Sequence, residues 1–247
     1  MRWMRTRSGS GTLCLVFTAI VFVACGRSDD AGAGTATVAP ASGQTVPQSL
    51  PMGGKKSVTT FFVTSTGPGM GGNLGGLTGA DAHCQALAKA EGSGDHTWHA
   101  YLSASATDGQ PAVNARDRIG SGPWYNAAGI LIAANVAGLH GDAAQINKET
   151  AVTERLDPLN GVGDTLNVHD ILTGSRPDGT ALPASDDLTC RNWTSSGEGR
   201  AQVGHHDRRG LGEGVNSWNS VHASQGCSPQ SLQATGGAGL IYCFGVD

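Results

Sequence analysis

The chain has 247 residues, of which 38 are glycine and 5% are aromatic, and its formal net charge is −4. Three of its sixteen basic residues fall within the first seven positions, so the rest of the chain is more acidic still. This charge balance argues against a nucleic-acid partner, because phosphates need a basic face. The abundance of glycine and the scarcity of aromatic residues favour a loop-rich domain.

The N-terminus has the features of an export signal. Arg2, Arg5 and Arg7 give a positive start, and twelve mostly apolar residues follow at 13–24. That apolar run suits the core of a signal peptide and is too short to span a bilayer. We therefore predict a signal peptide over 1–24 and an exported mature protein.

A cysteine directly follows this segment. The run "FVAC" ends with Ala24 before Cys25 and resembles the lipobox of bacterial lipoproteins. The resemblance implies cleavage before Cys25, a lipid on its thiol and attachment to a membrane. Gly26 stands where an Asp retains some lipoproteins at the inner membrane, which favours the outer membrane or cell surface. The alternative is an ordinary signal peptide ending near Ala24.

The next segment, 25–57, is small, polar and proline-containing, with almost nothing to bury. Such a composition cannot offset the entropy of ordering, so we predict a flexible tether. The remaining residues, 58–247, suit one domain in length.

Four cysteines lie in this domain: Cys84, Cys190, Cys227 and Cys243. In an exported protein they imply two disulfides, with three possible connectivities. No Cys-x-x-Cys pair supports a metal site instead.

Local patterns favour one connectivity. Residues 78–92 predict a helix with Thr78 as cap, Asp81 completing a capping box and Gly92 ending it. Cys84 lies on the apolar face of this helix. Residues 239–245 predict a short apolar strand that contains Cys243. We expect these two buried cysteines to pair, which leaves Cys190 for Cys227 in a nested arrangement.

The order of elements carries a family resemblance. A strand at 58–66 precedes the cysteine-bearing helix, a second strand follows at 97–105, and "GSRPDGTAL", "CRNWTS" and "SWNS" come later. This resembles the C-type lectin-like fold, its endostatin-like branch, and the leptospiral endostatin-like surface lipoproteins; residues 106–170 match only loosely. It implies an α+β fold with short antiparallel strands, one or two helices, a long irregular loop region and nested disulfides.

The resemblance raises the question of a calcium-bound sugar. Calcium-dependent lectins supply oxygens from a Glu-Pro-Asn-type tripeptide and a Trp-Asn-Asp tripeptide, because calcium needs six to eight oxygens. Here the matching positions read "RPD" at 176–178 and "WNS" at 218–220. Asp178 and Asn219 alone would leave the ion short of ligands. We interpret Trp218 as a core residue and Asn219 as closing a turn.

Two further segments are candidate metal sites. Asp157, Asn160 and Asp164, with Asn167 and Asp170 after them, could cage calcium, although the same residue types build self-capped loops.

The second segment is "GHHDRRG" at 204–210, which invites a zinc hypothesis with His205, His206, Asp207 and His222. Adjacent histidines on a strand point to opposite faces, so a polar loop is our preferred interpretation.

Two pairs of residues are candidate ligand contacts. Trp124 and Tyr125 could form an aromatic platform, although packing against the core is the simpler interpretation. Arg208 and Arg209 form an exposed basic pair that could meet an acidic ligand.

The sequence therefore predicts a surface-anchored binding module for an extracellular protein or glycan, with no cofactor required and calcium possible. The alternatives are a carbohydrate-binding lectin, with or without calcium, and a zinc-dependent hydrolase. No nucleophile elbow or phosphate loop is present, so we do not expect an enzyme.

Overall fold

The computed structural model describes residues 56–210 and 216–247. The predicted signal peptide, the lipidation site Cys25 and nearly all of the tether lie outside these residues. The described part is a mixed α/β domain with short strands, few helices and two disulfides, in agreement with the α+β expectation. Its helices are too short or too polar to cross a lipid bilayer.

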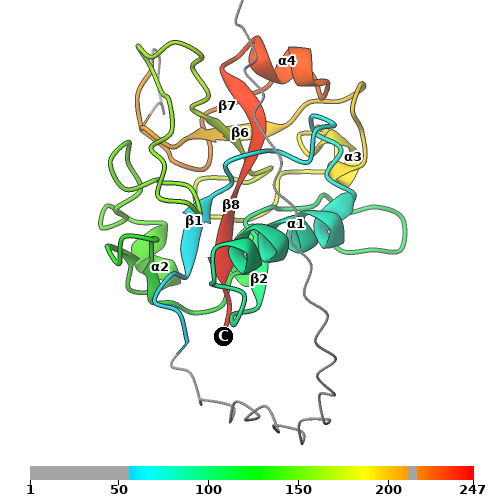
Figure 1. Cartoon of the computed structure of the whole chain (residues 1–247). Coiled ribbons are helices and arrows are strands. Elements are labelled where there is room, and N and C mark those ends of the chain that lie inside the picture. Colours follow the sequence, from blue (N-terminus) through cyan, green and yellow to red (C-terminus); the bar gives the residue numbers. More distant parts are fainter. Residues whose placement is uncertain (1–55, 211–215) are drawn as a thin grey trace, which may run out of the picture. The chain divides into compact units, whose positions relative to one another are not determined.

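A six-stranded sheet organises the domain. Its strands are β1 (Phe61–Val63), β2 (Trp98–Ala100), β5 (Asp170–Leu172), β6 (Gln202–His205), β7 (His222–Ala223) and β8 (Gly237–Gly245). The order is β1-β8-β5-β6-β7, and β2 also pairs with β8. Only the β5–β8 pair is parallel. Strand β8 runs through the middle of the domain, with β1 and β2 beside it (Figure 1).

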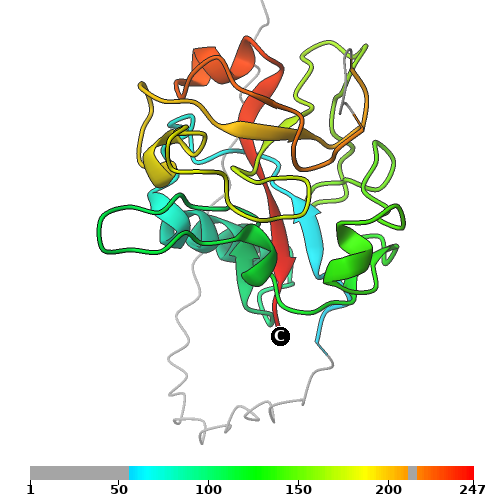
Figure 2. The ribbon, with the colours of Figure 1, turned by 180° about the vertical axis from the view of Figure 1, so that it is seen from behind.

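The other elements are short. A two-stranded sheet pairs β3 (Trp124–Tyr125) with β4 (Leu131–Ala133). The helices are α1 (Gly76–Ala90), a 3-10 turn (Ala115–Asp117), α2 (Val136–Leu139), α3 (Cys190–Trp193) and α4 (Pro229–Gln233). The view from behind shows long irregular segments between these elements (Figure 2). Glycine-rich loops therefore make up much of the chain, as its composition predicted.

Helix α1 begins differently from the prediction. It starts at Gly76 with Gly75 as N-cap in the left-handed region, and no side chain caps it, so the predicted capping box is wrong. Asp81 instead accepts the backbone N–H of Ala100 and pairs with both oxygens to Arg118. The helix ends at Ala90, and Gly92 takes a positive φ of 78°, as its predicted role requires.

Alternation along β8 explains why the sheet is buried on both faces. Leu240, Tyr242 and Phe244 face one hydrophobic cluster, while Ile241 and Cys243 face the other. Successive side chains of a strand point to opposite faces, so a continuous apolar run suits a central strand. Strand β8 thus belongs to both halves of the core.

The disulfides connect as predicted. Cys84 of α1 bonds to Cys243 of β8, and Cys190 of α3 bonds to Cys227. All four cysteines are fully buried in the same cluster. The pairing follows from the two apolar faces identified in the sequence.

Helix α3 is an unusual single turn. All four of its residues, Cys190–Trp193, have φ between 48° and 66°, which is a left-handed conformation. Each such residue costs on the order of 1–2 kcal/mol. The disulfide of Cys190 and the indole N–H of Trp193, which donates to the Ser103 carbonyl at 2.8 Å, hold the turn in place.

Removing either disulfide should lower stability. Chain entropy over sequence separations of 159 and 37 residues gives about 5 kcal/mol for the Cys84–Cys243 bond and about 4 kcal/mol for the Cys190–Cys227 bond. We expect the paired alanine variants to lose several kcal/mol each in urea unfolding. A paired variant as stable as the parent protein would contradict the roles given to these bonds.

Candidate metal centre

Three adjacent strands bring a carboxylate and two imidazoles together. Asp170 of β5 is the direct register partner of His205 on β6. His222 of β7 is the register partner of Val203, two residues before His205 and therefore on the same face of β6. The pairing of β5, β6 and β7 therefore positions all three side chains.

The three functional atoms form a small triangle. Asp170 Oδ1 lies 3.2 Å from His205 Nε2 and 3.5 Å from His222 Nε2. The two Nε2 atoms are 3.1 Å apart. Ligands bound at about 2.0–2.1 Å to a tetrahedral zinc ion lie about 3.3–3.4 Å from one another. The observed triangle therefore matches one face of a tetrahedral metal site.

The buried Asp170 carboxylate accepts no hydrogen bond among the described residues. Asp170 is 2% exposed, and both of its oxygens lack a hydrogen-bond partner among the described residues. The ring nitrogens are at hydrogen-bonding distance from Oδ1 but not at hydrogen-bonding angles. Burying a carboxylate without hydrogen bonds costs free energy. A cation at the centre of the triangle would bind the carboxylate oxygen directly and offset this cost.

A third imidazole, that of His169, lies against this triangle. His169 Nε2 is 3.3 Å from Asp170 Oδ1, and the His169 ring stacks on the His205 ring. Its other nitrogen, Nδ1, hydrogen-bonds to Asp207 Oδ1 at 3.3 Å. Asp207 also accepts the backbone N–H groups of Val162 and Arg209. Asp207 thus fixes the position of His169, whose ring in turn packs against that of His205.

The electrostatics keep both carboxylates ionised. Burial raises the pKa of Asp170, but the neighbouring His205 and His222 rings more than offset this and hold it below its ordinary value. Burial likewise opposes ionisation of Asp207, yet His169 and two backbone N–H groups hold its pKa well below the usual range. The nearby Asp170 carboxylate raises the pKa of His222 against the effect of burial. Two ionised carboxylates therefore supply negative charge that a cation could neutralise.

The sequence identified only part of this cluster. His205 and His222 belong to it, while His206 points away and contacts the Asn160 carbonyl at 3.1 Å through its Nε2. The expected opposite orientation of adjacent histidines is thus confirmed. Asp207 contacts His169 rather than the triangle.

His169 had no predicted role, and Asp170 was expected in a calcium-binding loop. The signal that could have found them is a His-Asp pair directly before the apolar Ile171 and Leu172 of a strand.

The proposed calcium loop does not converge on one point. Asp157 pairs with Arg155 at 3.0 Å, and Asp164 pairs with Lys148 and accepts the Gly161 N–H. The Asn160 amide donates to the Thr165 carbonyl at 2.9 Å. These contacts correspond to the alternative of a self-capped loop.

The two lectin-type tripeptides, at 176–178 and 218–220, are not arranged to bind calcium either. The Asn219 amide is 1% exposed and donates to the Tyr101 hydroxyl and to the carbonyls of Arg176 and Pro177. Asp178 is exposed and accepts from both donors of Thr180. Trp218 is buried and donates to the Leu139 carbonyl. Trp218 and Asn219 therefore have the packing and turn-closing roles that we preferred.

The other candidate contacts are largely internal. Trp124 is fully buried and donates its indole N–H to the Gly245 carbonyl at 3.2 Å, so it is a core residue and not an open platform. Tyr125 is half-buried. Arg208 is half-buried and donates to the Ala144 carbonyl, which corrects the expectation of an exposed pair; Arg209 is exposed.

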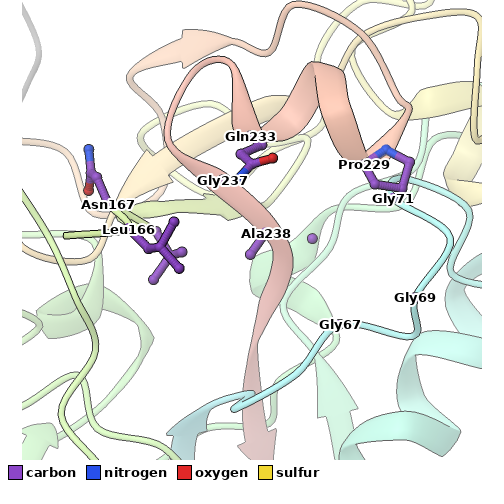
Figure 3. Close-up of a pocket in the computed structure, with 11 residues that line it drawn as sticks. Gly67, Gly69, Gly71, Leu166, Asn167, Pro229, Gln233, Gly237 and Ala238 are labelled. Carbon is purple, nitrogen blue, oxygen red and sulfur yellow. The ribbon is translucent and has the colours of Figure 1, made fainter. Parts of the chain in front are cut away.

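A cavity of about 320 Å³ lies beside the cluster. Four separate segments of the chain line it, mainly with glycine and aliphatic groups (Figure 3). One wall, 166–168, leads directly into His169, and another contains Gly237, the register partner of Asp170. A Cβ at the adjoining Gly236 would come within 3.0 Å of His169 Cδ2, so this glycine lets the ring pack closely.

No protein-family model matches the chain, and no curated protein is significantly similar to it. The C-type lectin-like and endostatin-like resemblance therefore stays a prediction from the sequence.

The burial of Asn219 generates a stability prediction. Replacing Asn219 with alanine leaves buried acceptors unpaired and should cost about 2–3 kcal/mol of unfolding free energy. Asp178→Asn is the control, because this side chain is exposed, and it should change stability by less than about 0.5 kcal/mol. Urea unfolding with and without calcium measures both. If calcium stabilised the parent protein and neither variant showed this stabilisation, the lectin-type calcium site would be supported after all.

Proposed function

We propose that the chain is an exported binding module whose functional site is a divalent transition-metal ion held by Asp170, His205 and His222. The observation that carries this proposal is the triangle of ligand atoms with edges of 3.1–3.5 Å, one of which belongs to a buried carboxylate that accepts no hydrogen bond among the described residues. Three ligands from three adjacent strands make the site an integral part of the sheet.

The donor set favours zinc over calcium. Two imidazole nitrogens and one carboxylate oxygen suit zinc and its neighbours in the first transition row, whereas calcium takes oxygen ligands almost exclusively. The described cysteines are all in disulfides and cannot serve as thiolate ligands. Zinc is therefore the metal that we propose.

The cellular setting is consistent with a binding role. The two disulfides indicate an oxidising, extracytoplasmic compartment. Within the proposal, Cys25 carries the lipid that attaches the module to a membrane, and residues 25–57 tether the domain. The partner would be an extracellular protein or glycan, as the family resemblance implies.

A zinc-dependent hydrolase is the second candidate, because hydrolytic zinc sites also use three protein ligands. Two of the three ligands are almost fully buried, since Asp170 and His205 are 2% and 3% exposed, and only the His222 side offers a substrate access to the ion. Binding is therefore the first proposal, and a hydrolase screen of the zinc-loaded protein tests the alternative.

Metal content tests the proposed function. The mature protein, purified without a histidine tag, should bind one zinc ion per chain in isothermal titration and in elemental analysis after dialysis. His205→Ala and Asp170→Asn should each abolish this stoichiometric binding, since each removes one of three ligands. Chelator should lower the melting temperature of the parent protein and leave that of His205→Ala unchanged.

The matched control is His83→Ala. His83 is a half-buried residue of α1 that hydrogen-bonds to the Thr66 carbonyl outside the cluster. This variant should retain one zinc ion with unchanged affinity. A parent protein that binds no zinc, or an equal loss of binding in the His83 variant, would refute the proposed site.

A further inference from the structure

We infer that the ion keeps a fourth coordination position, open to solvent beside His222, and that an anionic oxygen donor from outside the domain, such as a carboxylate, fills it. This inference rests on the proposed metal site and specifies how that site recognises a ligand. It follows from ring geometry, side-chain exposure and charge.

Ring geometry excludes His169 as the fourth ligand. The rings of His169 and His205 stack with centroids 4.0 Å apart and an interplanar angle of 21°. An imidazole nitrogen directs its lone pair within the ring plane, and two nearly parallel planes at this spacing share no point close to both nitrogens. One ion therefore cannot bind both rings in plane.

The rings of His205 and His222 are arranged differently. Their interplanar angle is 69° and their centroids are 5.1 Å apart, so they are not stacked, and their Nε2 atoms are 3.1 Å apart. Rings inclined in this way can both direct a lone pair at one ion. His169 is then a positioning residue: it stacks on His205 and connects it to Asp207. The described residues thus supply three in-plane ligands, which is the number found in zinc sites that keep a position for water or substrate.

Exposure indicates where the fourth position opens. The side chain of His222 is 37% exposed, whereas those of Asp170 and His205 are 1% and 4% exposed. His222 lies on β7, the last strand in the order of the sheet. An external group therefore reaches the ion from the His222 side.

Charge indicates the class of ligand. A divalent ion with one carboxylate ligand keeps a net positive charge and favours an anionic donor. Arg200 adds to this field: its Nε donates to the Ser224 carbonyl at 2.8 Å, two residues beyond His222. Arg200 is exposed, and its guanidinium would attract an incoming carboxylate to this side of the sheet.

Cobalt substitution tests the inference, because the visible d–d bands of Co²⁺ report its coordination. The cobalt-loaded mature protein is titrated with acetate, an anionic donor, and with imidazole, a neutral one. Both should shift the spectrum with saturation. Arg200→Gln should weaken acetate binding by about 2–5-fold and leave both cobalt affinity and imidazole binding unchanged.

The His169→Ala variant tests whether His169 is a metal ligand or a positioning residue. It should retain one cobalt ion per chain and a spectrum of the same type, with affinity reduced about 10–100-fold, whereas His205→Ala should lose the ion.

The outcomes distinguish the two proposals. Absence of any cobalt or zinc binding refutes the proposed function. If cobalt binds but neither acetate nor imidazole changes its spectrum, the inference of an open position is wrong while the metal site stands. The same holds if His169→Ala abolishes cobalt binding. Equal acetate affinity in the Arg200 variant overturns the anion preference.

Discussion

The pairing of β8 with its neighbours is the constraint on which the rest of the structure depends. This strand pairs with β1, β2 and β5, contributes side chains to both halves of the core, and is bonded covalently to α1 through Cys243. A loop-rich chain with few long elements needs such a fixed axis, because its ordering entropy is large and its regular hydrogen bonding is sparse.

The position of the site follows from this axis. Strand β5 lies parallel to β8, with Asp170 in register with Gly237, and β6 and β7 add outward from β5. Asp170 thereby becomes a buried carboxylate on a central strand of the sheet, faced by histidines from the next two strands. Without a cation, only the neighbouring histidine rings offset the desolvation of this carboxylate, whose oxygens accept no hydrogen bond among the described residues. A bound cation would connect β5, β6 and β7 at a single point.

The sequence predicted the parts of the structure that local patterns determine. The apolar face around Cys84 and the apolar run around Cys243 were enough to predict the disulfide pairing. The start of α1 was predicted wrongly, because Asp81 is used in a tertiary ion pair with Arg118 and not in a local cap.

The proposed metal cluster could not be predicted in the same way. Its ligands are separated by 35 and 17 positions in the sequence, and they meet only through the register of β5, β6 and β7. That register depends on packing across the whole sheet. Proximity in sequence instead suggested His206, whose side chain points to the opposite side.

X-ray absorption at the zinc edge of the metal-loaded mature protein tests the central claim most directly. The account predicts a four-coordinate ion with light ligands at about 2.0–2.1 Å, two of them imidazoles. A shell of six oxygens without imidazole scattering, or sulfur ligands at about 2.3 Å, would contradict it.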